Sequence, residues 1–171
     1  MLDNQIQFEH RPDGACVLRA SQVIPLPREQ IFPFFADARN LVVITPPAMR
    51  FQIRTPEPIT MHTGTLIDYT VRVVGVPLRW RTLISRWDPP DEFADEQLRG
   101  PYALWHHRHR FVSLDAARTR MDDEVIYRLP FAPLGNLVAP FVRRELRRIF
   151  SYRHSAIERA VTDGTLAGRP R

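Results

Sequence analysis

The sequence contains no lysine, so all 24 of its basic side chains are arginine. This absence excludes Schiff-base chemistry and any lysine nucleophile. Arginine pairs in a bidentate manner with carboxylates and phosphates, so we expect a few of these side chains to face a ligand and most to be solvated. The densest basic run, residues 143–148, has helical spacing with an apolar residue inside it. This spacing favours a solvated helix face, and we predict no nucleic-acid partner.

Cysteine and long apolar runs are also scarce. The single cysteine, Cys16, excludes an internal disulfide, and we expect a buried thiol in a reducing compartment. No segment approaches the ~20 consecutive apolar residues of a membrane-spanning helix, so no stable membrane insertion is predicted. The first five residues lack the basic and then apolar pattern of a secretion signal. We therefore predict a cytoplasmic protein.

Several catalytic motifs are missing as well. The sequence has no Gly-rich phosphate loop, no Gly-x-Ser-x-Gly, no His-Glu-x-x-His and no paired Cys-x-x-Cys. Conventional hydrolase, kinase and redox functions lose support. Ligand binding without chemistry and acid/base chemistry in a cavity remain as the two main classes.

What is present is typical of one compact domain. The chain has 171 residues, of which 44% are hydrophobic and 25% charged, an ordinary globular composition. We predict a single domain over residues 1–161 and a disordered tail over residues 162–171, where neither periodicity nor bulky side chains occur.

The order of elements predicts an α+β fold. A strand at 16–24 precedes two short helices, at 28–36 and at 38–44, the second with Asp37 as its N-cap. Turn signals then separate strands, which we place at 65–73, 78–87, 92–98, 103–114 and 119–129. A long amphipathic helix follows, with Asn136 as its expected N-cap. The prediction is a curved antiparallel sheet of about seven strands against this helix.

Alternation along the strands indicates which side chains point inward. Strand 65–73 places Ile67, Tyr69 and Val71 on one face. For strand 78–87 both faces carry apolar and arginine residues, which leaves its register open. On the final helix, an apolar stripe includes Phe141 and Ile149.

Polar residues fall among these inward positions. Asp123 shares a face with Val125 and Tyr127, and a buried acid needs a partner such as Arg81 or His107. A structural ion pair that fixes the register is the main interpretation, and a catalytic acid or base is the alternative.

His107 and His109 share one face of a strand, which would suit a metal ion. No third ligand is obvious nearby in the sequence, so we interpret both as hydrogen-bonded cavity or sheet residues and predict no metal and no cofactor.

Four sets of residues resemble one known family. They are 34–41 with 44–47, 64–69, 97–102 with 105–107, and 127–131. In this order they resemble the START-like, or SRPBCC, superfamily with its helix-grip fold, and in particular bacterial ligand-binding and polyketide cyclase/dehydrase-like members. The resemblance spans roughly residues 16–160, and it implies a cavity between the sheet and the C-terminal helix.

We therefore predict a protein that binds a small apolar molecule of lipid, polyketide or aromatic type. The predicted cavity residues are Ile67, Tyr69, Val71, Arg81, Gln97, His107, His109, Asp123, Val125, Tyr127, Phe141 and Ile149. One alternative is a cyclase or dehydratase that moves protons with these polar groups, although the prediction favours a protein that is not an enzyme. Another is an interaction module whose basic helix binds a protein partner or an anionic surface.

Overall fold

The computed structural model describes residues 5–73, 75–131 and 134–166. Within them the chain forms, in order, β1 (Ile6–His10), β2 (Cys16–Ile24), α1 (Arg28–Phe35), the 3-10 helices η1 (Ala38–Val42) and η2 (Pro47–Met49), β3 (Gln52–Ile53), β4 (Leu66–Val73), β5 (Val76–Asp88), β6 (Glu92–Arg99), β7 (Leu104–Asp115), β8 (Arg118–Arg128) and α2 (Leu134–Thr162). The α+β helix-grip class is confirmed.

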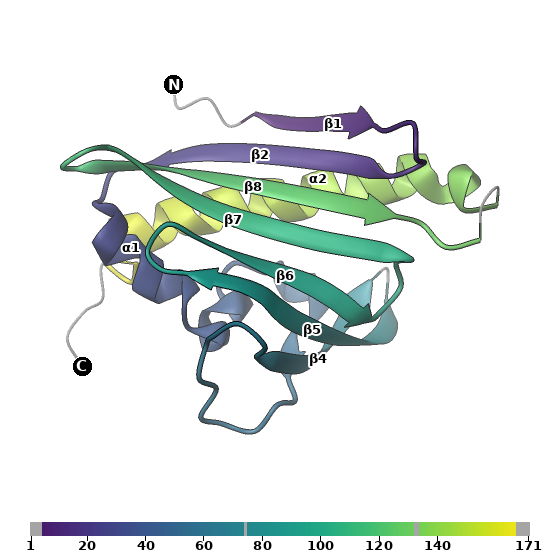
Figure 1. Cartoon of the computed structure of the whole chain (residues 1–171), viewed down its shortest axis with the longest axis horizontal. Coiled ribbons are helices and arrows are strands. Elements are labelled where there is room, and N and C mark those ends of the chain that lie inside the picture. Colours follow the sequence, from purple (N-terminus) through teal and green to yellow (C-terminus); the bar gives the residue numbers. More distant parts are fainter. Residues whose placement is uncertain (1–4, 74, 132–133, 167–171) are drawn as a thin grey trace.

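The strands of the described residues form one eight-stranded antiparallel sheet in the order β1-β2-β8-β7-β6-β5-β4-β3 (Figure 1). Six of them lie within two residues of their predicted bounds. The sheet has eight strands, where about seven were predicted. Besides the six strands placed from the sequence, β1 pairs along β2 at one edge and the two-residue β3 pairs with β4 at the other. Both additions are short edge strands, whose sequence signal is weak.

The first short helix after β2 is α1, within one residue of its predicted bounds, and the second is shorter than predicted. The segment after Asp37 is a 3-10 helix that ends at Val42, rather than a helix that extends to Ile44. Asp37 is its N-cap, as predicted, and its side chain accepts a hydrogen bond from the backbone N–H of Arg39 at 2.9 Å. Helix α2 begins at Leu134, so Asn136 lies inside the helix and is not its N-cap.

The structure shows which face of β5 points inward, a question that the sequence left open. Trp80, Thr82 and Ile84 are buried, whereas Arg79 and Arg81, on either side of Trp80, are exposed. The pairing with β6 shifts register between Arg81 and Thr82 and again between Ile84 and Arg86. Such irregularities bend a strand and increase its twist. This part of the sheet therefore curves away from α2.

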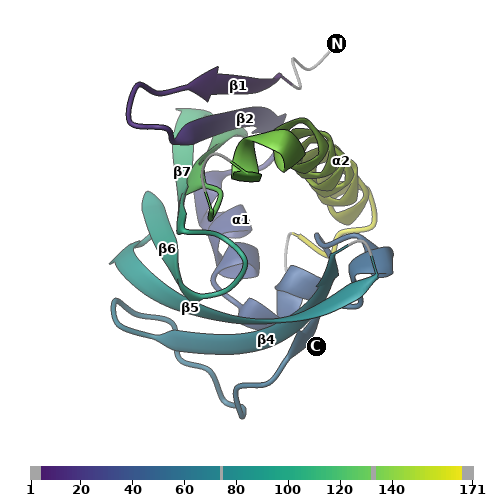
Figure 2. The same ribbon diagram turned by 90° about the vertical axis from the view of Figure 1, so that its right-hand side faces the viewer.

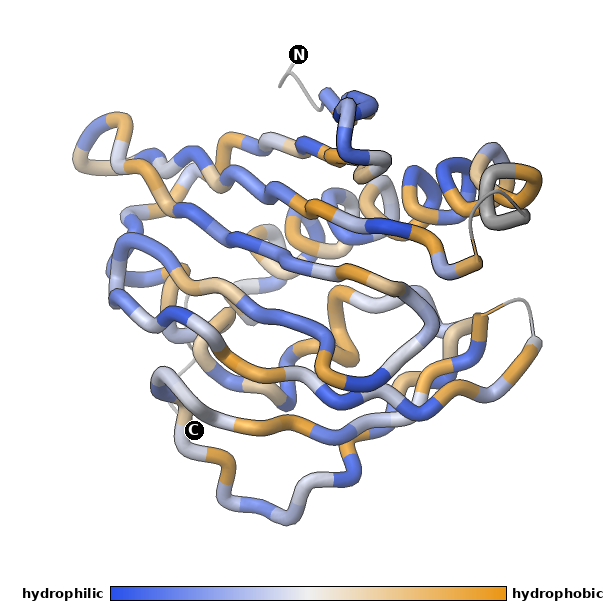
Figure 3. Tube along the Cα trace, turned by 45° about the vertical axis from the view of Figure 1, so that its right-hand side comes forward, coloured by the Kyte–Doolittle hydropathy of each residue, from blue (hydrophilic) through white to orange (hydrophobic). Residues whose placement is uncertain are grey.

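Figure 2 shows the result of this curvature: α2 lies on the concave side of the sheet, close to β2, while β5 and β4 curve round opposite it. Hydrophilic and hydrophobic residues both occur along the strands (Figure 3). The burial of the side chains alternates clearly in β8, as expected for a sheet with one covered and one solvated face.

The C-terminal end of α2 closes the core at α1. Leu166 is 1% exposed, and it packs in the same cluster as Ile31, Phe35 and Ile157. Gly164 has a φ of 77°, a left-handed conformation that ends the helix and turns the chain back. The predicted tail from residue 162 is therefore wrong for 162–166, because an isolated apolar residue gives no periodic signal; residues 167–171 lie outside the described residues.

Candidate functional site

A cavity of about 230 Å³ lies between the concave face of the sheet and the helices. Its walls come from α1, η1, strands β4 to β7 and α2. Most lining side chains are apolar or aromatic. The polar ones that matter here are Thr82, Asp95, His107, His109 and Arg153.

Seven of the twelve predicted cavity residues line this space: Ile67, Tyr69, Val71, His107, His109, Phe141 and Ile149. The strand residues among them alternate along β4 and β7, so each faces the concave side. Phe141 is exposed and Ile149 half-buried, and both come from α2.

Two predicted residues lie away from the cavity. The guanidinium of Arg81 is on the outer face of β5, where its Nε and Nη2 each donate to the carboxylate of Asp68 at 2.8 Å. The register of β5 is the reason, since Thr82 takes the inward position. Gln97 closes the turn after β6: its side-chain amide donates to the carbonyl of Tyr102 at 2.7 Å and accepts from the Tyr102 N–H at 3.2 Å. These two expectations are corrected.

Val125 and Tyr127 face the concave side, but α2 covers them directly. They are 0% and 2% exposed, and they pack with Leu18, Leu146 and Phe150 rather than bordering the open space. The prediction that they line the cavity is therefore wrong. Helix α2 packs directly on β2 and β8, and the cavity lies between α2 and strands β4 to β7.

Asp123 is buried behind the two histidines. Its Oδ1 lies 3.0 Å from Nε2 of His107 and 2.7 Å from Nδ1 of His109. The predicted pairing with His107 is present, whereas Arg153 of α2 takes the place proposed for Arg81, with its Nε 3.5 Å from Asp123 Oδ2. Asp123 does not border the cavity itself; its partners do.

Asp95 and Arg153 were missed as site residues. Asp95 is the register partner of His107 across β6 and β7, and its Oδ2 lies 3.3 Å from Nε2 of His109. Arg153 comes three residues after Phe150 and four before Ile157, so it occupies the buried stripe of α2. That spacing was a signal in the sequence, but arginine is usually assigned to the solvated face.

The electrostatics of this cluster follow from burial and pairing. Burial lowers the pKa of His107 to about 4, with the neighbouring His109 acting in the same direction. Burial also opposes the charge of His109, but the carboxylates of Asp123 and Asp95 raise its pKa above the ordinary value. Burial would raise the pKa of Asp123, yet Arg153 and His109 hold it well below the usual range.

The far wall of the cavity is aromatic. Trp80 stacks on Tyr69 with ring centroids 5.9 Å apart, and it meets Trp105 edge to face at 5.4 Å. The hydroxyl of Tyr69 lies 3.3 Å from Oγ1 of Thr82, and burial raises its pKa. It therefore stays protonated at neutral pH and is available as a hydrogen-bond donor.

A curved sheet that grips a long helix over an apolar cavity defines the START-like, helix-grip class. The family model described as polyketide cyclase / dehydrase and lipid transport matches residues 24–150, so the chain belongs to this SRPBCC-type family. No curated protein matches the sequence.

Solved structures share the fold at low sequence identity. An aromatase/cyclase, ZhuI of Streptomyces sp. R1128, is 19% identical with a TM-score of 0.63, covering 89% of this chain and 93% of its own. A START superfamily protein of Mycobacterium smegmatis is 12% identical with a TM-score of 0.63, covering 84% and 97%. A norcoclaurine synthase of Thalictrum is 13% identical with a TM-score of 0.64, covering 94% and 99%. At these identities the likeness shows the fold alone.

Among the described residues, no helix combines the length and hydropathy needed to span a bilayer. The expected cytoplasmic location, the absence of a nucleic-acid partner and the possible protein partner stay predictions.

Proposed function

We propose that the protein binds a small, largely apolar molecule of aromatic or polyketide type in the cavity between the sheet and α2. The observation that carries this proposal is the mostly apolar lining of a cavity of about 230 Å³. Ligand sites are typically concave and apolar with a few converging polar groups. Membership of a family described as polyketide cyclase / dehydrase and lipid transport supports the same class of ligand.

The cavity also indicates the size of the ligand. An apolar cavity of roughly 150 Å³ holds one benzene ring, so about 230 Å³ accommodates one or two rings. The aromatic wall of Tyr69, Trp80 and Trp105 offers faces and edges for such rings. A longer ligand would extend toward the exposed Phe141, which also lines the cavity.

One end of the ligand should carry oxygen. Asp95, His107 and His109 are the polar groups on the β6 and β7 wall, and an apolar atom placed against them would leave buried polar groups without partners. A hydroxyl or carbonyl there would be bonded by the imidazoles or by the Tyr69 hydroxyl.

The test compares one substitution at two sites. Val71→Trp places a ring in the cavity, so uptake of a two-ring fluorescent probe such as naphthol should be lost while cooperative unfolding is kept. Val125→Trp places the same ring where α2 already packs, and overpacking should cost roughly 1–3 kcal/mol of unfolding free energy. If the wild type takes up no probe, or Val71→Trp takes it up as well as the wild type, the cavity-binding proposal fails.

A second candidate is a cyclase or dehydratase that transfers protons on such a ligand. The observation in its favour is that His107, His109 and Asp95 border the cavity rather than serving only the sheet. His109, with a raised pKa, would act as the acid, and the low pKa of His107 makes it the neutral partner. Turnover of a polyketide-type substrate that is lost in His109→Gln with ligand binding retained would support it; a wild type that binds but never turns over any such substrate contradicts it.

A further inference from the structure

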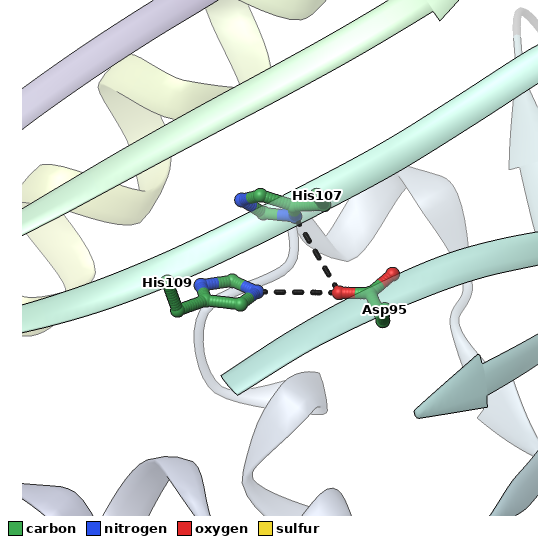
Figure 4. Close-up of side chains that lie close together, drawn as sticks. All are labelled: Asp95, His107 and His109. Carbon is green, nitrogen blue, oxygen red and sulfur yellow. Dashed lines mark hydrogen bonds and ion pairs between the residues drawn. The ribbon is translucent and has the colours of Figure 1, made fainter. Parts of the chain in front are cut away.

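Three side chains on the cavity wall turn electron-rich atoms toward one point. They are Oδ2 of Asp95 from β6, and Nδ1 of His107 and Nε2 of His109 from β7 (Figure 4). These atoms all lie within 4.8 Å of one another, and the residues are half-buried or buried. The two histidines alternate on one strand, and Asp95 is opposite His107 in the neighbouring strand. The fold therefore presents all three from a rigid sheet.

The outer nitrogens of the imidazoles show which ring atoms carry hydrogen. Nε2 of His107 and Nδ1 of His109 lie 3.0 and 2.7 Å from Oδ1 of Asp123. At that distance from a carboxylate oxygen each nitrogen must hold a proton, because two lone pairs would repel. Nδ1 of His107 is then the lone-pair atom of a neutral ring. Nε2 of His109 lies within hydrogen-bond distance of Oδ2 of Asp95, at 3.3 Å, and a metal ion bound there would replace the proton that this contact shares.

The distances differ between the outer and inner contacts. The outer contacts, at 3.0 and 2.7 Å, are at or close to the length of hydrogen bonds to a charged group, about 2.7–2.9 Å. The inner contacts are longer, at 3.3 Å from Asp95 Oδ2 to His109 and 3.8 Å to His107. Ligand atoms about 2.1 Å from one tetrahedral zinc ion lie roughly 3.4 Å apart. The inner spacing therefore fits atoms that share one ion, and the 3.3 Å contact of His109 also fits a hydrogen bond in the metal-free protein.

We propose that Asp95, His107 and His109 bind one divalent first-row transition metal ion of the zinc or iron(II) type at the cavity wall. Two imidazoles and one carboxylate are ligands for such ions, and they leave coordination positions open. Asp123 holds the outer nitrogens of both rings, which is the usual support of a metal-binding histidine. The open positions face the cavity, because all three ligands line it. An oxygen of the bound molecule would complete the coordination.

Arg153 is the charged neighbour that this site must accommodate. Its Nε lies 3.5 Å from Oδ2 of Asp123, and its Nη2 lies 3.3 Å from Nδ1 of His109. Both contacts are on the outer side of the histidines, where Arg153 compensates the Asp123 carboxylate. The arginine therefore does not occupy the inner point where the three ligand atoms meet.

The test is titration of the chelator-treated full chain with Co²⁺, followed by visible absorption, and with Zn²⁺, followed by calorimetry. We expect one equivalent per chain, and an affinity at least ~100-fold weaker in Asp95→Asn and in His109→Gln. His106→Ala is the matched control: His106 precedes His107 on β7 but pairs across the sheet with Ile126 and has the opposite facing, so this variant should bind as the wild type does.

Three results would overturn the metal site: no saturable binding by the folded wild type, unchanged affinity in Asp95→Asn and His109→Gln, or loss of binding in His106→Ala. Far-UV circular dichroism spectra show whether each variant is folded. If one variant is unfolded, the metal stoichiometry of the wild type still tests whether the site exists. The titration is made without any apolar ligand, so its outcome is independent of the cavity-binding proposal.

Discussion

The two sides of the concave face differ although one helix covers both. On the β2 and β8 side, Leu18, Val125 and Tyr127 are 0–2% exposed and fill the space beneath α2. On the β4 and β5 side, Ile67, Val71 and Tyr69 line an open cavity. The side chains are of similar character, so chemistry does not separate the two sides. The curvature of the sheet does, because the register shifts in β5 carry that edge away from the helix.

The buried polar cluster lies at the boundary between these two sides. Asp123 on β8 belongs to the packed side, whereas Asp95 on β6 belongs to the cavity side, and the histidines of β7 stand between them. A polar group there can be paired from behind and still present its other edge to a ligand. The comparison therefore predicts different outcomes for substitutions on each side.

The largest expected effect is at the boundary. Asp123→Ala leaves His107 and Arg153 buried without their carboxylate, which should cost about 3–5 kcal/mol of unfolding free energy. Asp68→Ala removes the exposed partner of Arg81 and should cost less than about 1 kcal/mol. Urea unfolding of both variants measures the difference. Equal losses would mean that the cluster is not a buried charge network.

A smaller effect should separate the packed side from the cavity side. Val125→Ala opens a new void in filled space and should cost about 2–3 kcal/mol. Val71→Ala enlarges a space that already exists, where the side chain has fewer partner atoms to lose, so about 1 kcal/mol is expected. The same urea experiment compares the two. A larger loss for Val71→Ala would contradict the assignment of filled and open sides.

The smallest effect concerns pH and a histidine of α2. Burial lowers the pKa of His154 in the folded protein, so below about pH 6.5 the unfolded chain takes up a proton that the folded chain does not. This lowers the unfolding free energy as the pH falls, by at most about 1.4 kcal/mol per pH unit. His154→Gln should weaken this dependence between about pH 7 and about pH 5. The exposed His62→Gln is the control, and an identical pH profile for wild type and His154→Gln would disprove the assignment.

Local pattern predicted most of the fold but only part of the site. Alternation in β4 placed Ile67, Tyr69 and Val71 correctly, because in a strand with one buried face the apolar residues at every second position identify the inward face. Strand β5 did not, since its two faces look alike and the register shifts decide which one is inward. Arg81 was misplaced for that reason.

The two missed residues depend on long-range pairing. Asp95 becomes a site residue only through its register with His107, and Arg153 only through the position of α2 over β7. A histidine pair spaced by two and an acid on an apolar face were visible locally, which is why His107, His109 and Asp123 were found. Asp95 and Arg153, which lie 14 and 44 residues from His109 in the chain, were not found, because nothing local links them to the histidines.

The central claim is that one side of the concave face is open to a small apolar ligand and the other is filled. Methyl NMR spectra recorded while naphthol is added would test it most directly. The account predicts saturable shifts for the methyl groups of Ile67, Val71 and Ile149, which line the cavity, and none for those of Leu18 and Val125. Saturable shifts at Leu18 and Val125, or no saturable shift at any cavity methyl group, would contradict it.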